Sequence, residues 1–347
     1  MHFQQELISW YSLNKRDLPW RNTNNPYLIW LSEIILQQTR VAQGLPYYER
    51  FVEQFPTLSD LAKASETDVL KLWEGLGYYS RGRNLHATAK FIFDNLNGVF
   101  PSDYDSLIRL KGIGVYTAAA VSSFSINERQ AVVDGNVYRV LSRYFGVFDP
   151  IDSTLGKKIF SKLANELISE VDPGLFNQSI MEFGALVCKP KNPDCMNCPV
   201  KLGCFAVLND KIAELPQKSK KLVKKERFLN YFLVQNDDKV LVKQRESGDI
   251  WQGLFDFPLI EFETKSIDFT SLVPNVFDDN KIENFKLIKS YRHVLTHQLL
   301  NVQFFKAPNI NSTFIADNKL IWVSLEELVN LPKPRVVQQF ISGYLEI

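Results

Sequence analysis

The pattern of apolar residues changes about three-fifths of the way along the chain, and this change limits what the chain can fold into. Before about residue 208, apolar residues recur three and four positions apart in stretches such as ETDVLKLWEGL and STLGKKIFSKLANELISEV, which is typical of amphipathic helices. After residue 228, segments such as RFLNYFLVQ, KVLVKQR and LLNVQFFKA have the pattern of strands. SLEEL has the capping-box spacing that begins a helix. We therefore predict a helical part followed by a mixed sheet-and-helix part.

The two parts are joined by a lysine-rich segment. Residues 201–230 hold eight Lys or Arg and three Asp or Glu, although the whole chain has a net charge of only +1. A length of 347 residues also favours two domains, since a typical domain has about 150 residues. We predict a helical domain over residues 1–208, a basic linker over 209–227 and an α+β domain over 228–347. A solvated tether and a phosphate contact both fit the linker.

All four cysteines lie within 17 residues, in the order C-x6-C-x2-C-x5-C: Cys188, Cys195, Cys198 and Cys204. Thiols this close together in a reducing compartment typically hold a metal. The spacing leaves the metal open. Only one C-x2-C pair is present, whereas a structural zinc site more often has two, and this favours an iron–sulfur cluster. The alternative is four buried cysteines that act as small apolar side chains.

The first twenty residues have no basic segment followed by an apolar run, and no stretch is long and apolar enough to span a membrane. We expect a cytoplasmic protein without a membrane partner.

A tight turn is predicted in LKGIGVYTAAA, between two helical segments. It lacks the third glycine and the preceding strand of a dinucleotide-binding fingerprint. The backbone amides around Gly112 and Gly114 would instead lie at a helix N-terminus, where they suit a phosphate oxygen. The turn resembles the helix-hairpin-helix motif of DNA-binding proteins, and an ordinary helix connection is the alternative.

Two carboxyls have contrasting surroundings. Glu33 lies in PYLIWLSEIILQQT, a helix that is apolar on most sides, so desolvation should raise its pKa as a general acid requires. Asp134 precedes a predicted helix in AVVDGNVYRVLSR, where helix-terminal amides favour the ionised form. The pKa values of the two groups should therefore be pushed apart, giving one proton donor and one stabiliser of positive charge. A surface glutamate and a simple N-cap are the alternative interpretations.

These motifs occur in one order that resembles the endonuclease III superfamily of base-excision glycosylases. LPWR, GLGYYSR and FNQSIMEFGALVC are also similar to segments of the MutY-type adenine DNA glycosylases within that superfamily, and the similarity covers essentially the whole chain. The resemblance implies an all-α helix-hairpin-helix glycosylase module with an iron–sulfur cluster loop, followed by an α+β Nudix-like C-terminal domain. It implies a monomer that binds a [4Fe–4S] cluster and double-stranded DNA containing adenine mispaired with 8-oxoguanine or guanine.

The resemblance also assigns roles to residues. It implies chemistry by Glu33 and Asp134 with support from Tyr116 and Asn136, and cluster binding by the four cysteines. The implied adenine pocket contains Arg16, Leu18, Trp20 and Gln178. The implied DNA-binding and wedge residues are Gln38, Tyr78, Gly112 and Gly114.

The C-terminal part lacks a glutamate-rich Nudix box, so we predict no nucleotide hydrolysis by it. Its implied role is to recognise 8-oxoguanine opposite adenine. The family's Phe-Ser-His loop corresponds here to Leu295, Thr296 and His297. Threonine keeps a hydroxyl for the base edge, whereas leucine replaces an aromatic contact.

Residue 116 separates two activities within the superfamily. Bifunctional members place a lysine in this part of the hairpin helix to form a Schiff base, and the residue here is Tyr116. We therefore predict a monofunctional glycosylase. The alternatives are a pyrimidine-lesion glycosylase and lyase of the endonuclease III type, a non-catalytic DNA damage-binding protein, and a Nudix-type hydrolase with a DNA-binding appendage.

Overall fold

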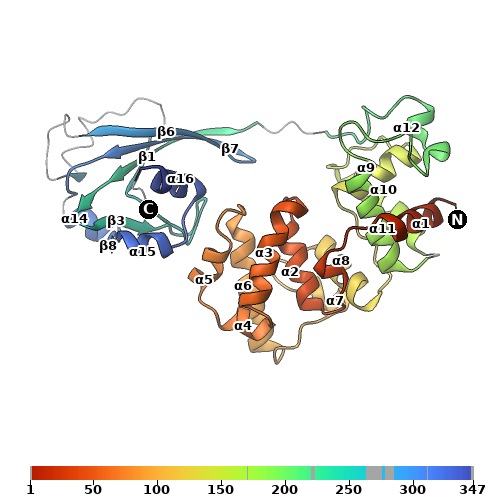
Figure 1. Ribbon diagram of the computed structural model, residues 1–347, viewed down its shortest axis with the longest axis horizontal. Coiled ribbons are helices and arrows are strands. Elements are labelled where there is room, and N and C mark those ends of the chain that lie inside the picture. Colours follow the sequence, from red (N-terminus) through yellow and green to blue (C-terminus); the bar gives the residue numbers. More distant parts are fainter. Residues whose placement is uncertain are drawn as a thin grey trace. The chain divides into compact units, whose positions relative to one another are not determined.

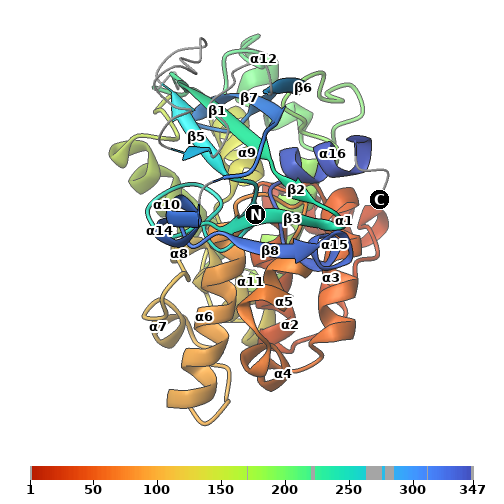
Figure 2. The ribbon, with the colours of Figure 1, turned by 90° about the vertical axis from the view of Figure 1, so that its left-hand side faces the viewer.

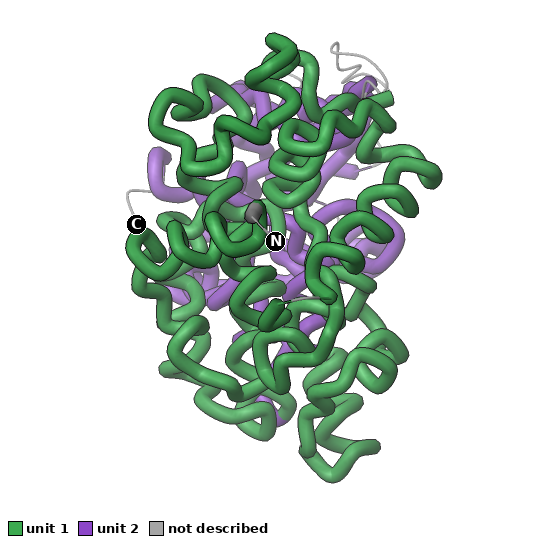
Figure 3. Tube along the Cα trace, turned by 90° about the vertical axis from the view of Figure 1, so that its right-hand side faces the viewer, with its two compact units in different colours: residues 1–62, 87–221 green, residues 63–86, 222–347 purple. Residues whose placement is uncertain are grey.

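The computed structural model describes residues 2–169, 171–219, 223–262, 276–277, 285–310 and 312–344 (Figure 1). The chain forms two compact units, one of residues 1–62 and 87–221 and the other of residues 63–86 and 222–347 (Figure 3). The predicted boundaries at residues 208 and 228 stay a prediction, and residues 220–222 of the predicted linker lie outside the described residues. No helix in the described ranges is both long and apolar enough to cross a membrane.

The first unit is built from helices. The longer ones are α1 (His2–Asn14), α2 (Pro26–Leu36), α3 (Val41–Gln54), α8 (Val115–Ile126), α9 (Gly135–Phe145), α10 (Thr154–Ile168) and α11 (Pro173–Leu186). Short segments are η1 (Pro19–Arg21), α7 (Tyr104–Leu107), η2 (Lys201–Gly203) and α12 (Phe205–Leu208). Helices α4 (Leu58–Lys63) and α6 (Tyr79–Asn95) each contribute residues to both units. Among the described residues before Lys225 there is no strand, as the helical periodicity predicts.

Helix α11 is central to the core of the first unit. It packs against α1 and α9, while α2 packs against α8. Phe160, Phe176 and Phe183 are among the buried residues of this core, and fully burying one such side chain stabilises the fold by about 1.5–3 kcal/mol. Gly184 allows a close crossing, because a Cβ there would lie 2.7 Å from the Cβ of Asn136 on α9. This approach fixes the first turn of α9 against α11.

The second unit contains two sheets (Figure 2). The strands are β1 (Lys225–Leu233), β2 (Gln235–Asn236), β3 (Lys239–Gln244), β4 (Phe255–Asp256), β5 (Leu259–Phe262), β6 (Lys286–Val294), β7 (Gln298–Lys306) and β8 (Ile321–Ser324). One sheet has the order β5-β1-β7-β6, in which β1 and β7 are parallel and the other neighbours antiparallel. In the other sheet β3 pairs with β2, β4 and β8. The predicted strands are thus present.

Helices complete the second unit. They are α5 (Glu66–Leu72), α14 (Ser312–Asp317), α15 (Leu325–Asn330) and α16 (Arg335–Tyr344). The capping box predicted in SLEEL is present, since Ser324 and Glu327 exchange hydrogen bonds at the start of α15. On α16, the ring of Phe340 stacks on Phe304 of β7 with 4.0 Å between centroids. Because β6 and β7 form a hairpin, this contact also supports the loop Leu295–His297 that joins them.

Candidate active site

Glu33 is buried in the middle of α2, with 7% of its surface exposed. The helix starts at Pro26, where the side chain of Asn25 accepts a hydrogen bond from the amide of Tyr27. Tyr116 on α8 donates its hydroxyl to Glu33 Oε2 at 2.7 Å. Burial raises the pKa of Glu33 to about 7, with Asp134 adding to the rise and Tyr116 opposing it. At neutral pH this carboxyl can therefore hold a proton and release it.

Asp134 caps the N-terminus of α9, as predicted. Its Oδ1 accepts hydrogen bonds from the amides of Asn136 and Val137, both at 2.8 Å, and its Oδ2 accepts one from Asn136 Nδ2 at 2.7 Å. Burial nevertheless raises the pKa of Asp134, outweighing the hydrogen bonds and the charge of Arg139, which lower it. The expectation that helix-terminal amides would set the direction of this shift is wrong, because the carboxyl is desolvated as well as capped.

A small pocket opens beside Glu33. Its lining residues are Trp20, Arg21, Ile29, Ser32, Glu33, Phe124, Gln178 and Met181. Of the four side chains expected around adenine, Trp20 and Gln178 line this pocket, whereas Arg16 and Leu18 do not. Tyr11 donates its hydroxyl to Gln178 Oε1 at 2.6 Å, which holds the amide in one orientation.

Glu182 is a neighbour of this pocket that the sequence analysis did not single out. Only 1% of its surface is exposed. It accepts hydrogen bonds from Arg16 Nε at 2.8 Å and from Arg21 Nη2 at 2.7 Å. Burial acts to raise its pKa, but the bonds from both arginines outweigh burial and lower the pKa to about 2. Glu182 follows Gln178 by four residues, and residues four apart lie on the same face of a helix. This spacing could have indicated that Glu182 lies near the predicted adenine pocket.

The predicted hairpin lies between α7 and α8. Gly112 has φ +85°, a conformation that favours glycine, and Gly114 is the N-cap of α8 with no side-chain cap. The amides of the first turn of α8 therefore have no side-chain acceptor at the cap. Gln38, just after α2, is exposed and has φ +58°.

An arginine connects Asp134 with the cysteine loop. Asn136, which donates to Asp134, accepts a hydrogen bond from Arg139 Nη2 at 2.8 Å through Oδ1. Arg139 also donates to the carbonyl oxygens of Gly184 at 2.7 Å and Cys188 at 2.6 Å. A continuous set of hydrogen bonds thus runs from the first cysteine to the carboxyl of Asp134.

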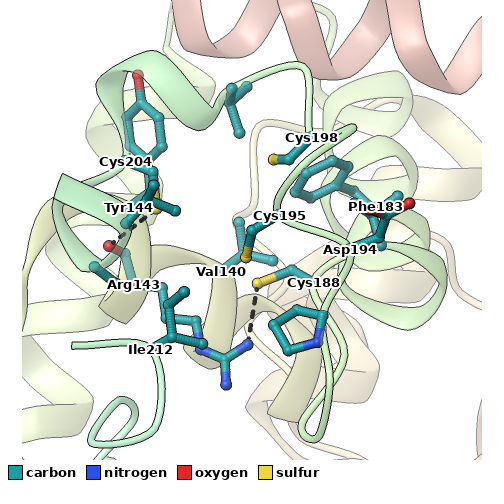
Figure 4. Close-up of a pocket in the computed structure, with 15 residues that line it drawn as sticks. Val140, Arg143, Tyr144, Phe183, Cys188, Asp194, Cys195, Cys198, Cys204 and Ile212 are labelled. Atoms are coloured by element: carbon teal, nitrogen blue, oxygen red, sulfur yellow. Dashed lines mark hydrogen bonds between the residues drawn. The ribbon is translucent and has the colours of Figure 1, made fainter. Parts of the chain in front are cut away.

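The four cysteines line one cavity, together with residues of α9, α11 and α12 (Figure 4). All four are free thiols. Arg143 Nη1 lies 3.5 Å from Cys188 Sγ, and burial is the main reason that the pKa of Cys198 rises to about 11. In the described ranges, no group of three or more His, Cys, Asp or Glu side chains has the arrangement that would hold a metal ion. Four cysteines on one cavity are nevertheless the set of donors that iron–sulfur clusters use.

In the second unit, Tyr78 lies beside the loop Leu295–His297. Tyr78 has φ +50° and is 47% exposed, and its hydroxyl contacts that of Thr296. Both residues line a pocket with Leu295, His297 and Trp251. The structure thus brings Tyr78 together with the three residues of the predicted lesion-recognition loop.

Two family models match the chain. Residues 31–166 match the HhH-GPD superfamily base excision DNA repair protein, and residues 230–343 match the NUDIX domain. The chain is 34% identical over 342 residues to the adenine DNA glycosylase of Buchnera aphidicola subsp. Baizongia pistaciae, covering 96% of this chain and 94% of that protein. It is 31% identical over 396 residues to the adenine DNA glycosylase of Schizosaccharomyces pombe, covering 94% and 86%.

Solved structures resemble about three-fifths of the chain. A thermostable thymine-DNA glycosylase superposes with a TM-score of 0.55 and 28% identity, covering 59% of this chain and 95% of that one. A non-covalent endonuclease III–DNA complex has a TM-score of 0.52 and 21% identity, covering 60% and 94%, which concerns the fold alone.

Proposed function

Because this chain belongs to the adenine DNA glycosylases, the hydrolases of base excision repair predicted from its motifs, we propose that it removes adenine opposite 8-oxoguanine or guanine in duplex DNA. The fold class predicted from the sequence, a helical glycosylase module followed by an α+β NUDIX domain, is confirmed as well. The observation that carries the proposal is Glu33, buried beside a small pocket with its pKa raised to about 7. A base inside a duplex is out of reach, so the enzyme must flip adenine into that pocket.

In this mechanism Glu33 donates its proton to N7 of adenine, which makes the base a leaving group. The hydroxyl of Tyr116 holds the carboxyl in place by its hydrogen bond of 2.7 Å. As the bond to the sugar breaks, Asp134 stabilises the oxocarbenium-like sugar by its charge, and water completes hydrolysis. Asn136 and the two helix amides fix the orientation of Asp134.

The pocket selects adenine by shape and by a few polar groups. Trp20 offers an aromatic surface and Gln178 an amide whose orientation Tyr11 fixes. Leu18 is buried, lies close to Trp20 in the sequence and does not line the pocket. Arg16 acts through Glu182, because its guanidinium is bound to that carboxylate.

We assign a [4Fe–4S] cluster to Cys188, Cys195, Cys198 and Cys204, because four thiols line one cavity without forming a disulfide. The four thiolates would hold such a cluster, and its binding would order the loop, since the free energy of metal binding becomes local folding energy. Lys189, Lys191 and Lys201 of the loop then face the phosphate backbone. Arg143 and Arg139 tie the loop to α9.

The protein binds DNA as a monomer through both units. The amides around Gly112 and Gly114 hold a backbone phosphate, and Gln38 fills the space that the flipped adenine leaves. Tyr78 stacks beside the opposite base, while Thr296 and His297 contact its edge and Leu295 supplies an apolar contact.

The test is single-turnover base release from duplexes with adenine opposite 8-oxoguanine, guanine or cytosine, for the wild type and Glu33→Gln. We expect fastest release opposite 8-oxoguanine, loss of release in the variant, and strand breaks only after alkali. Strand cleavage at the rate of base loss would instead indicate a lyase of the endonuclease III type. Tight binding without release from any duplex would indicate a damage-binding protein.

A further inference from the structure

Lys333 is a buried lysine in the second unit that the proposed chemistry does not use. Only 3% of its surface is exposed. Its ammonium donates to the carbonyl oxygens of Leu331 at 2.7 Å and Val329 at 3.0 Å, and lies 3.6 Å from Glu74 Oε1. Removing an ammonium group from water costs several kcal/mol unless it is paired and hydrogen-bonded. These contacts meet that cost and fix the geometry around the lysine.

Glu74 and Tyr79 of the same unit contact this lysine. The backbone amide of Lys333 donates to Glu74 Oε1 at 3.3 Å, and its carbonyl accepts from the hydroxyl of Tyr79 at 3.2 Å. Lys71 donates to Glu74 Oε2 at 2.9 Å and to the carbonyl of Val329 at 2.6 Å. Backbone and side chain of Lys333 therefore both bind the segment that ends α5 and begins α6.

Tyr78 lies inside that segment, and contacts of Trp73 hold the turn around it. The indole Nε1 of Trp73 donates to the carbonyl of Gly77 at 3.0 Å. A Cβ on Gly82 would lie 3.0 Å from the Trp73 ring, so the chain packs directly on the indole. A displacement at Glu74 or Tyr79 would therefore be passed on to Tyr78.

On its other side, Lys333 is linked to the loop Leu295–His297. It lies two residues before α16, whose Phe340 stacks on Phe304 of the β6-β7 hairpin. The carbonyl of the preceding Pro332 accepts a hydrogen bond from the amide of Phe255 on β4. Lys333 thus contacts the turn that carries Tyr78 directly, and it is linked through α16 and Phe340 to the hairpin that carries Thr296.

We propose that Lys333 is a positioning residue that holds Tyr78 against the loop Leu295–His297 and so sets the preference for 8-oxoguanine over guanine opposite adenine. The proposal rests on the lesion-recognition role given above to Tyr78 and that loop. It requires no contact between Lys333 and DNA.

The experiment compares Lys333→Met with Lys319→Met in the full chain. Lys319 is the matched control, because its side chain is 78% exposed and pairs with exposed Glu246 at 2.6 Å. Single-turnover adenine release is measured opposite 8-oxoguanine and opposite guanine. For Lys333→Met we expect the ratio of the two rates to fall by about tenfold, mainly through slower release opposite 8-oxoguanine, since a broken buried ion pair is costly. For Lys319→Met the ratio should not change.

A second readout separates positioning from general destabilisation. The ratio of rates should be the same in Tyr78→Ala and in the double variant that also carries Lys333→Met, because the side chain that Lys333 positions is already absent. Hydrogen exchange of the amides in residues 74–80 and 295–298 should speed up in Lys333→Met alone. If Lys333→Met folds poorly, Glu74→Gln breaks the same contact and should lower the ratio in the same direction.

Equal loss on both duplexes, with a lower midpoint of unfolding, would mean a structural role and would overturn the proposal. A second contrary result is a wild type that releases adenine faster opposite 8-oxoguanine while Lys333→Met keeps the same ratio of rates. That result would also overturn the role of Lys333 and would leave the proposed function intact. A wild type that releases adenine equally from both duplexes would overturn the lesion-recognition role itself, and the role of Lys333 with it.

Discussion

At the scale of single residues, three carboxyls of the first unit differ in what stabilises their charge: Glu33 and Glu182, which are buried, and Asp134, which is half-buried. Glu33 has one hydrogen bond and a raised pKa, Asp134 has three hydrogen bonds and is still raised, and Glu182 has two arginines and a lowered pKa. Burial alone favours the neutral form in each case. Hydrogen bonds from two arginines therefore keep Glu182 ionised. At Glu33 the hydrogen bond from Tyr116 and the charge of Arg21 offset burial only in part, so that this group can carry a proton.

Base release should depend on pH through Glu33. Because burial raises its pKa to about 7, the protonated form is present below pH 7 and is lost as the pH rises through it. The single-turnover rate should fall above pH 7 with a slope of one proton. Glu33→Gln should lower the rate by about 10²–10⁴-fold, the usual contribution of a general acid. A wild-type rate that is flat from pH 6 to pH 9 would contradict the role of this group.

The same shift predicts a pH dependence of stability. The folded pKa lies above the ordinary value of 4.5, so the protonated carboxyl stabilises the fold fully below pH 4.5, and this contribution is lost as the pH rises through 7. Glu33→Gln cannot ionise, so its free energy of unfolding should rise relative to the wild type between pH 5 and pH 8.5, by about 3 kcal/mol at most. Urea unfolding of both proteins at pH 5 and pH 8.5 measures this. If the difference in free energy of unfolding between variant and wild type is the same at both pH values, the pKa of Glu33 is not raised by burial.

The sequence predicted the raised pKa of Glu33, because a carboxyl among Trp30, Ile29 and Ile34 has little water around it. That prediction is confirmed. It did not predict the direction for Asp134, because capping can be read from the sequence but desolvation by distant segments cannot. Glu182 was missed for a similar reason, since its partners Arg16 and Arg21 are more than 160 residues away in the chain.

At the scale of elements, the crossing of α9 and α11 determines where Asp134 is held. Apolar residues three and four positions apart indicate helices, but the distance at which two helices cross depends on which small residue meets which backbone. One sequence does not reveal that pairing. The parallel pairing of β1 with β7 was equally out of reach, because strands 73 residues apart at their first residues give no local signal of their partner.

Gly184→Ala should disturb the site through this crossing. The new methyl would lie 2.7 Å from the Cβ of Asn136 and 3.0 Å from its carbonyl oxygen, so α9 must move. Overpacking of this kind costs about 1–3 kcal/mol. We expect slower adenine release together with a lower free energy of unfolding. Gly343→Ala on α16 is the control, because nothing lies within 4 Å of a Cβ there; equal behaviour of the two variants would argue against the crossing as the cause.

At the scale of the whole molecule, hydrogen bonds connect the cysteine loop, residues 188–204, to α9 and through α9 to Asp134. Arg143 and Arg139 on α9 bind carbonyls of the loop at 2.8 Å and 2.6 Å. We therefore expect a change of order in the loop to affect Asn136 and Asp134.

Cys198→Ser tests this connection. With one thiolate ligand replaced, we expect iron and acid-labile sulfide to be lost and residues 188–204 to become accessible to protease. Affinity for mispaired duplex DNA should fall, because the loop lysines would no longer be held in one arrangement. Iron and sulfide analysis and a binding titration at fixed salt measure both effects. Normal DNA affinity in a protein without iron would show that the loop does not help to bind DNA.

The division of the chain into units also bears on how the protein can be shortened. Residues 63–86 come from the first quarter of the sequence, yet they belong with residues 222–347. Ending the chain after the lysine-rich segment would therefore not remove an independent appendage. Glu74, Lys71 and Tyr79 would lose Lys333 and Val329, and the turn around Tyr78 would be left without its support. In a truncated protein the segment that ends α5 and begins α6 would thus lose contacts that it has in the full chain. We therefore expect the activity of the truncated protein to differ from that of an intact glycosylase module.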